Sequence, residues 1–174
     1  AMRDRVPRPD WRQLMAPVRS SDLAAVILLL LVMLTGGLTA FAVRLFEWLV
    51  NRLFTLGYTQ LPGWLGSAGL PGWSAFLLFP ALLGLAHAGV RRLTPRADRH
   101  HAIPLVILAL ARREGRLRPF STLLKTVASI LTLGAGGSLG REGPVVLLGA
   151  GLGSALGQLL PIRPQWRRAL VVAG

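Results

Sequence analysis

The residues of this chain best suited to chemistry are an arginine and a glutamate, Arg141 and Glu142, side by side within a glycine-rich break. Gly143, Pro144 and a long apolar run follow them. A proline at the first helical position gives up no needed hydrogen bond, so the sequence predicts a helix that starts at Gly143-Pro144. The unpaired N–H groups of such a first turn, together with the helix dipole, form an anion site. We therefore expect a small anion such as chloride to bind around Gly140, Arg141 and Gly143.

Glu142 lies where its carboxylate competes with an anion for the same N–H groups. When protonated, the side chain loses this attraction and can swing away, so that one residue would act both as gate and as proton carrier. The alternative is an ordinary acid at a helix start, which stabilises the helix dipole by about 0.3–1 kcal/mol. An ionisable group inside a membrane is functional by default, and this favours the gate. Arg141 either neutralises Glu142, raises the positive potential for anions or points to water, and the sequence does not decide among these three.

The composition is that of a membrane protein. Of the 174 residues, 52% are hydrophobic and only 16% are charged, below the roughly 25% typical of soluble domains. Basic residues outnumber acidic ones by 20 to 7, for a net charge of +13. Because the arginines cluster between apolar segments, as in the cytoplasmic loops of membrane proteins, we expect no nucleic acid as partner. The chain has no cysteine, which excludes disulfides and thiolate chemistry.

Two apolar segments, 23–50 and about 73–90, are long enough to cross a bilayer. A loop rich in glycine and proline is predicted between them at 51–72. Arginines precede the first segment and follow the second, so by the positive-inside rule the basic N-terminal segment 1–22 and residues 91–101 are cytoplasmic. We expect a multi-pass protein of the plasma or inner membrane.

The second half of the chain consists of shorter apolar pieces. Residues 102–111 would form a helix of only about 15 Å, too short to cross the membrane alone. Two further short helices are predicted at 120–137 and 144–160, on either side of the glycine-rich break. Irregular backbone at membrane depth is tolerated where it lines a cavity, and transporters aim such half-helices at their substrates. The pattern predicts an all-α integral membrane fold with broken and re-entrant helices.

One stripe of the helix at 144–160 carries a glycine at every fourth position, namely Gly149, Gly153 and Gly157. This spacing predicts close packing against a neighbouring helix. The glycines match neither a dinucleotide-binding fingerprint nor a phosphate-binding loop.

The residues closest to a metal-ligand pattern are Asp98, His100, His101 and the distant His87. Adjacent histidines do not readily share one ion, so these side chains do not make a complete site. No catalytic constellation stands out in so acid-poor a chain. We expect no enzymatic activity, no metal and no cofactor.

Residues 140–144 read GREGP, which resembles the signature of the CLC family of chloride channels and chloride/proton antiporters, the voltage-gated chloride channels among them. In that family the glutamate is the gate, so the resemblance assigns this role to Glu142. Residues 144–157 resemble the glycine-rich helix that follows the signature. Residues 36–52 resemble the end of the family's first membrane helix.

A second family motif, GSGIP, starts another half-helix some forty residues earlier, with its serine facing the chloride. The matching stretch here is 100–104, which keeps only Ile103 and Pro104 and has His101 in place of the serine. An imidazole N–H can donate to chloride, and a protonated His101 would attract an anion more strongly, in a pH-dependent way. Chloride, nitrate, fluoride and another small anion all stay open as the transported ion.

The resemblance covers most of residues 23–174, which we interpret as a partial CLC-type transmembrane domain, the incomplete first half of an inverted repeat. It implies an anion channel or a chloride/proton antiporter, in which protons are a second ligand. It also implies a lipid bilayer around the chain and a homodimer of the full-length protein. The alternative is a non-transporting membrane module that keeps the signature, either a regulatory or assembly subunit or a degenerate relic.

Overall fold

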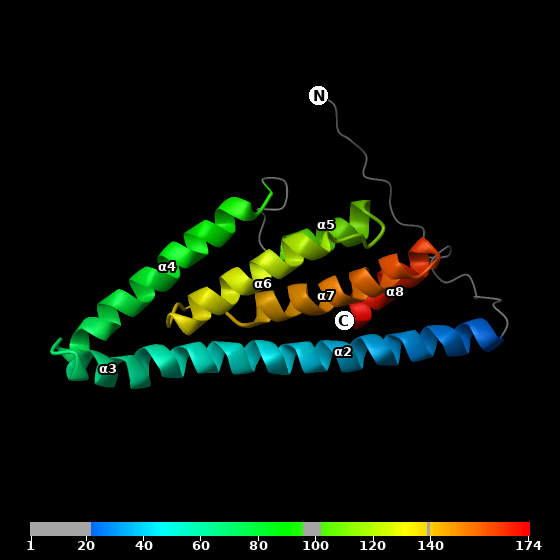
Figure 1. Ribbon diagram of the computed structural model, residues 1–174. Helices are drawn as coiled ribbons and strands as arrows, with labels where there is room; N and C mark the ends of the chain where they lie inside the picture. Colours follow the sequence, from blue (N-terminus) through cyan, green and yellow to red (C-terminus); the bar gives the residue numbers. More distant parts are fainter. Residues whose placement is uncertain (1–21, 96–101, 139) are drawn as a thin grey trace, which may run out of the picture.

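The computed structural model describes residues 22–95, 102–138 and 140–174, and every regular element in these ranges is a helix (Figure 1). The α-helices are α2 (Asp22–Thr55), α3 (Leu61–Ser67), α4 (Ala75–Leu93), α5 (Ala102–Arg112), α6 (Pro119–Gly134), α7 (Glu142–Leu159) and α8 (Pro164–Ala173). A π-helix, η1 (Leu56–Gln60), joins α2 to α3, and a short 3-10 helix, η2 (Gly72–Ser74), precedes α4. The predicted all-α fold is confirmed.

The longest helix, α2, runs along one side of the molecule (Figure 1). Its 34 residues contain no proline, and they extend over about 51 Å, more than the ~30 Å of a hydrocarbon core. With η1 and α3 the apolar stretch reaches from Ala25 to Ser67, and only 11% of its apolar window is buried. The stretch Gly72–Leu93 is 6% buried in the same sense. Both stretches are long and apolar enough to cross a membrane, and they present their apolar side chains outward.

Residues 51–72, predicted as a loop, are mostly helical. The helix α2 continues to Thr55, and η1 and α3 follow it directly. Pro62 accounts for the π-helix, because a proline lacks an N–H and its ring crowds the carbonyl four residues earlier. The N–H of Leu61 accordingly bonds to the carbonyl of Leu56, five residues back. Pro62 itself falls in the first turn of α3, where no N–H is needed.

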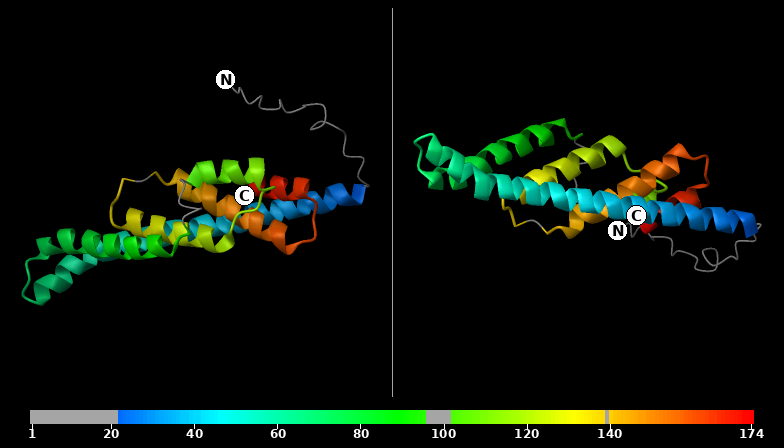
Figure 2. Two further views of the ribbon diagram at one scale, coloured as in Figure 1. Left: turned by 90° about the horizontal axis from the view of Figure 1, so that it is seen from above. Right: turned by 60° about the horizontal axis from the view of Figure 1, so that its bottom comes forward.

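The helices α6, α7 and α8 pack against α2 from one side. The helix α4 turns back from the far end of α2, and α6 lies between α4 and α7 (Figure 2). The helix α7 is central, since it packs against α2, α5, α6 and α8. The bounds of α5, α6 and α7 agree within a few residues with the three short helices predicted from the sequence.

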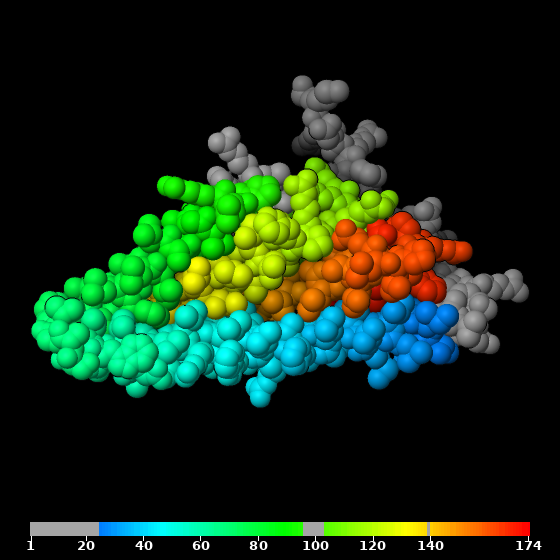
Figure 3. All heavy atoms as spheres, viewed as in Figure 1, coloured from blue at the N-terminus to red at the C-terminus, as the bar shows by residue number. Residues whose placement is uncertain are grey.

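Two buried apolar clusters hold these helices together. The first joins α5, α7, α8 and the loop after α5, through Leu105, Val106, Ala109, Leu117, Leu147, Ala150 and Val171. The second joins α2 to α6, through Phe46, Val50 and Leu133, with Val145 of α7 packed against it. The outer surface of α2 is continuous in Figure 3 and carries exposed apolar side chains such as Leu29, Met33 and Phe41. The chain therefore has both a small core and a large apolar exterior.

The glycine stripe of α7 packs directly on α8, as its spacing predicted. A Cβ atom at Gly149 would collide with the carbonyl oxygen of Gly174. One at Gly153 would lie 2.7 Å from the carbonyl carbon of Leu170, and one at Gly157 would press into a side chain of α8. Because two of these three obstacles are backbone, no rotamer change relieves them. The two helices are as close as they are only because α7 has no side chains here.

We predict that Gly153→Ala destabilises the protein, whereas Gly89→Ala does not. A methyl group at Gly153 meets the backbone of Leu170, and such overpacking costs about 1–3 kcal/mol. A methyl group at Gly89 of α4 has nothing within 4 Å, and alanine favours a helix over glycine by about 1 kcal/mol. Thermal unfolding in detergent measures the difference. Equal melting temperatures for the two variants would contradict the packing described.

Candidate functional site

The predicted site lies where the chain reverses between α6 and α7 (Figure 1). We call residues 135–141, apart from the undescribed position 139, the glycine corner. Gly136 has φ of +81°, a left-handed conformation that glycine adopts without steric cost. The N–H of Gly137 bonds to the carbonyl of Thr132 at 2.9 Å and closes the last turn of α6. The helix α7 then begins at Glu142.

A tyrosine from the distant π-helix holds the corner in place. The hydroxyl of Tyr58 donates to the carbonyl of Ala135 at 2.6 Å. A Cβ atom at Gly136 would lie 3.1 Å from the same hydroxyl, so a larger residue there would displace the tyrosine. The ring of Tyr58 packs against three further rings at centroid distances of 4.7 to 5.7 Å, those of Phe54, Phe76 and Phe79. The segment joining the two long apolar helices thus fixes the end of α6.

The helix α7 starts two residues before the predicted Gly143-Pro144 start. Glu142 is its first residue, and Pro144 is the third, still within the first turn where a proline is tolerated. The N–H of Val145 bonds to the carbonyl of Arg141 at 3.2 Å. Since Pro144 has no N–H, the amides of the N-cap Arg141 and of Glu142 and Gly143 are the three that have no partner within the helix. The side chain of Arg141 does not cap them.

The charged side chains at this start point outward. Arg141 and Glu142 are both exposed and form no ion pair with each other, whereas Pro144 is buried and Gly143 is half-buried. A pocket of about 380 Å³ lies beside the corner, lined by Val50, Asn51, Phe54, Leu133, Gly136, Gly137 and Arg141. Its charged and amide groups come from Arg141 and Asn51. A cation and a neutral donor therefore stand next to the free helix start.

The helix α5 begins in the same way as α7. Pro104 is its third residue, as Pro144 is the third of α7. Leu105 of α5 and Leu147 of α7 belong to one buried cluster, so the first two turns of both helices pack into the same core. Of the predicted site residues, the structure brings Gly140, Arg141, Glu142 and Gly143 together at the start of α7.

The remaining predicted site residue, His101, lies outside the described residues, as does the whole segment 96–101. His87 has a structural setting instead. It is half-buried on α4, and its Nδ1 lies 3.0 Å from Oγ1 of Thr132 and 3.2 Å from the carbonyl of Ala128, both on α6. Within the described ranges no three His, Cys, Asp or Glu side chains group as metal ligands would.

Comparison with known proteins shows the family to which the chain belongs. The model of the voltage-gated chloride channel family matches residues 82–174, from the middle of α4 to the last described residue. The chain belongs to the voltage-gated chloride channel family. The matched range includes the glycine corner and Glu142. Members of this CLC family are channels or transporters rather than enzymes. Family membership and the two long apolar helices show that the chain is a membrane protein.

Two relatives of this CLC chain illustrate the extent of the match. Chloride channel protein CLC-e of Arabidopsis thaliana is 34% identical over 151 residues, which are 81% of this chain and 20% of the plant protein. The voltage-gated ClC-type chloride channel ClcB of Escherichia coli is 33% identical over 145 residues, 80% of this chain and 34% of the bacterial protein. The chain thus spans between a fifth and about a third of these relatives. No solved structure matches it.

The sequence gives no indication of the contacts that hold the glycine corner in place. Tyr58 and Ala135 are 77 positions apart, and Tyr58 lies in a stretch whose glycines and prolines predict a loop. Asn51 belongs to the same stretch and shows no pattern that ties it to Arg141. Only the folded path of α2 and η1 brings these residues to the start of α7.

We predict that Tyr58→Phe loosens the glycine corner without changing the fold. The substitution keeps the aromatic packing but leaves the carbonyl of Ala135 without its donor. A net loss of about 1 kcal/mol would raise local hydrogen exchange roughly fivefold. Exchange of residues 134–141, followed by mass spectrometry, measures this. As a control, Ser67→Ala removes a hydroxyl that bonds only within α3 and should leave the corner unchanged. Equal exchange in both variants would contradict the role of Tyr58.

Proposed function

We propose that this chain forms part of the anion pathway of a chloride channel or chloride/proton antiporter, with Glu142 as its gate. The observation that carries the proposal is the start of α7. The amides of Glu142 and Gly143 have no partner within the helix, and the first of these two residues also carries a carboxylate. Family membership supports anion transport, and the plant and bacterial relatives are both described as chloride channels.

The first turn of α7 suits an anion for electrostatic reasons. The 18 residues of α7 align their peptide dipoles, which leaves about half a positive charge at the helix start. Arg141 lies one residue earlier and lines the neighbouring pocket, so it raises the local concentration of anions. The exposed carboxylate of Glu142 can approach the two amides or leave them to an incoming ion. Protonation removes its charge and favours the ion.

The start of α5 supplies the second contact of the proposed pathway. His101 immediately precedes α5, whose first turns share a buried core with those of α7. An imidazole there donates a hydrogen bond to the anion when neutral and adds a charge when protonated. The preference among chloride, nitrate and fluoride would then depend on His101. In the full-length protein we expect a homodimer in a lipid bilayer, with the N-terminus cytoplasmic and protons as second ligand in the antiporter case.

We predict that Glu142→Gln removes the contribution of Glu142 to the pH dependence of anion flux in the full-length protein. Glutamine has nearly the same shape, but it neither carries a proton nor competes as an anion. Flux of chloride from liposomes, measured with and without a pH gradient, should depend less on pH than in the parent, with the remaining dependence coming from groups such as His101, and any coupled proton movement should stop.

The matched control is Glu47→Gln. Glu47 is also a glutamate of the apolar region, and it pairs with Arg44 at 3.7 Å on α2 and does not line the pocket beside the corner. This variant should keep the parent's flux and pH response. If Glu142→Gln also kept them, Glu142 would not be the gate.

A further inference from the structure

A larger cavity, of about 620 Å³, lies at the other end of α7 from Glu142. It is lined by Arg112, Arg113, Glu114, Arg116, Leu117, Arg118, Pro119 and Gln158. Gln158 stands sixteen residues after Glu142 along α7, which is roughly 24 Å. The cavity is therefore separate from the proposed anion site.

The loop that forms this cavity is held by polar groups of α7. Leu117 is 3% exposed, its N–H donates to Oγ of Ser154 at 2.8 Å, and its carbonyl accepts from Nε2 of Gln158 at 2.9 Å. Ser154 also donates to the carbonyl of Gly115 at 2.7 Å. With Leu117 fixed inward, the exposed Arg116 and Arg118 on either side of it are carried at the surface.

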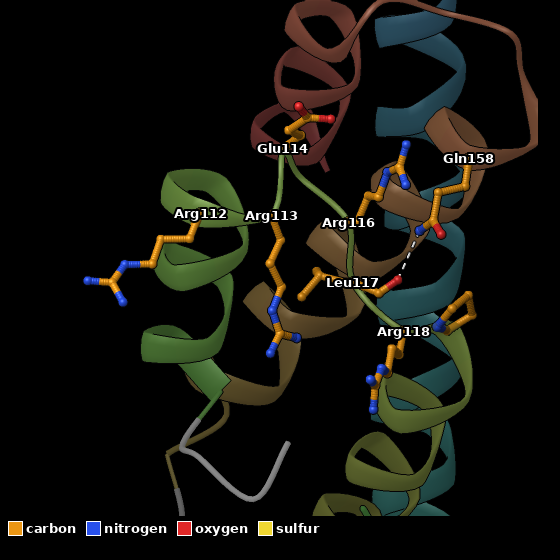
Figure 4. A pocket seen from close by; sticks show the side chains of 8 residues that line it. Arg112, Arg113, Glu114, Arg116, Leu117, Arg118 and Gln158 are labelled. Carbon is orange, nitrogen blue, oxygen red and sulfur yellow. Dashed lines mark hydrogen bonds between the residues drawn. The ribbon is translucent and has the colours of Figure 1, made fainter. Parts of the chain in front are cut away.

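The cavity has an excess of positive charge. Four arginines and one glutamate line it. In Figure 4 Arg113 and Arg118 project to one side of the loop and Arg116 to the other, Gln158 reaches the carbonyl of Leu117 from α7, and Arg112 points away from the loop. The helix α6 starts at Pro119 on the cavity wall, so the positive end of its dipole adds to the same field. The site suits a group with at least one negative charge and several acceptor oxygens.

An apolar stripe leads away from the cavity along α6. Phe120, the residue after Pro119, is 63% exposed, and Leu123 is 62% exposed. Val127 continues the row at 37%. Residues at this spacing share one face of a helix. A charged cavity thus borders an apolar strip on a helix of a membrane protein.

We propose that this cavity binds the phosphate headgroup of an anionic membrane lipid, with an acyl chain lying along Phe120, Leu123 and Val127. Basic pockets between membrane helices on the cytoplasmic side bind such headgroups, and arginine-rich loops mark that side. A soluble phosphate would use the arginines but not the apolar stripe. The combination of both features favours the lipid. The lipid would act as a clamp across α5, α6 and α7.

The test uses the purified full-length protein in a neutral detergent. Short-chain phosphatidylglycerol, phosphatidylcholine of the same chain length, and glycerol 3-phosphate are titrated separately, and bound molecules are counted by native mass spectrometry. The parent should bind phosphatidylglycerol in preference to the other two. Arg116→Gln combined with Arg118→Gln should weaken that binding roughly thirtyfold, because each basic residue near an anionic lipid contributes about fivefold.

The matched control is Arg91→Gln combined with Arg92→Gln. These arginines end α4, carry the same charge and do not line the cavity, so binding should stay within a few-fold of the parent. Replacing Arg116 and Arg118 by lysine should retain most of the affinity if the effect is one of charge. The proposal is overturned if the parent shows no preference for phosphatidylglycerol over phosphatidylcholine. It is also overturned if glycerol 3-phosphate binds equally well, or if both glutamine pairs weaken binding alike.

Discussion

The contact between the backbones of α7 and α8 is the constraint on which the rest of the structure depends. Gly149 and Gly153 let the carbonyls of α8 approach closer than any side chain would permit. That contact fixes the axis of α7, the one helix that packs against α2, α5, α6 and α8. The packing of α7 against these four helices therefore also sets where its two ends lie. The glycine corner and the arginine-lined cavity lie at those two ends.

The polar groups at the start of α7 face outward, whereas those at its other end bond within the protein. At the start, amides without helical partners and the side chain of Glu142 face outward beside Arg141. At the other end, Ser154 and Gln158 turn inward and satisfy the backbone of the arginine-rich loop between α5 and α6. An unsatisfied helix start is costly when buried in protein or lipid. In a bilayer, an anion bound at the start of α7 would offset this cost, which is the physical reason for proposing one there.

Much of this arrangement is predictable because it is encoded locally. The fourfold spacing of Gly149, Gly153 and Gly157 predicts close packing, and prolines near each helix start predict the bounds of the short helices. The stretch 51–72 is not predictable in this way, because its glycines and prolines normally break helices. Here Pro62 falls in the first turn of α3, and the chain accommodates it by a π-helix rather than by a loop. Whether such a stretch is helical depends on how the helices pack against one another, which the local sequence does not show.

The candidate site also has a part that can be predicted from the local sequence and a part that cannot. Glu142 and its glycines are contiguous, so their chemistry can be inferred from the sequence alone. The bond from Tyr58 to Ala135, which holds the corner, joins segments 77 residues apart and exists only in the fold. Asn51, which shares a pocket with Arg141, depends likewise on the length of α2.

The central claim is that the amides of Glu142 and Gly143 offer one place to either a carboxylate or an anion. Crystals of the full-length Glu142→Ala protein grown in bromide test it most directly, because bromide replaces chloride and scatters anomalously. We expect an anomalous peak within hydrogen-bonding distance of both amides, at the place for which the carboxylate of Glu142 would compete in the parent protein. An empty site, or amides capped by other protein groups, would contradict the account.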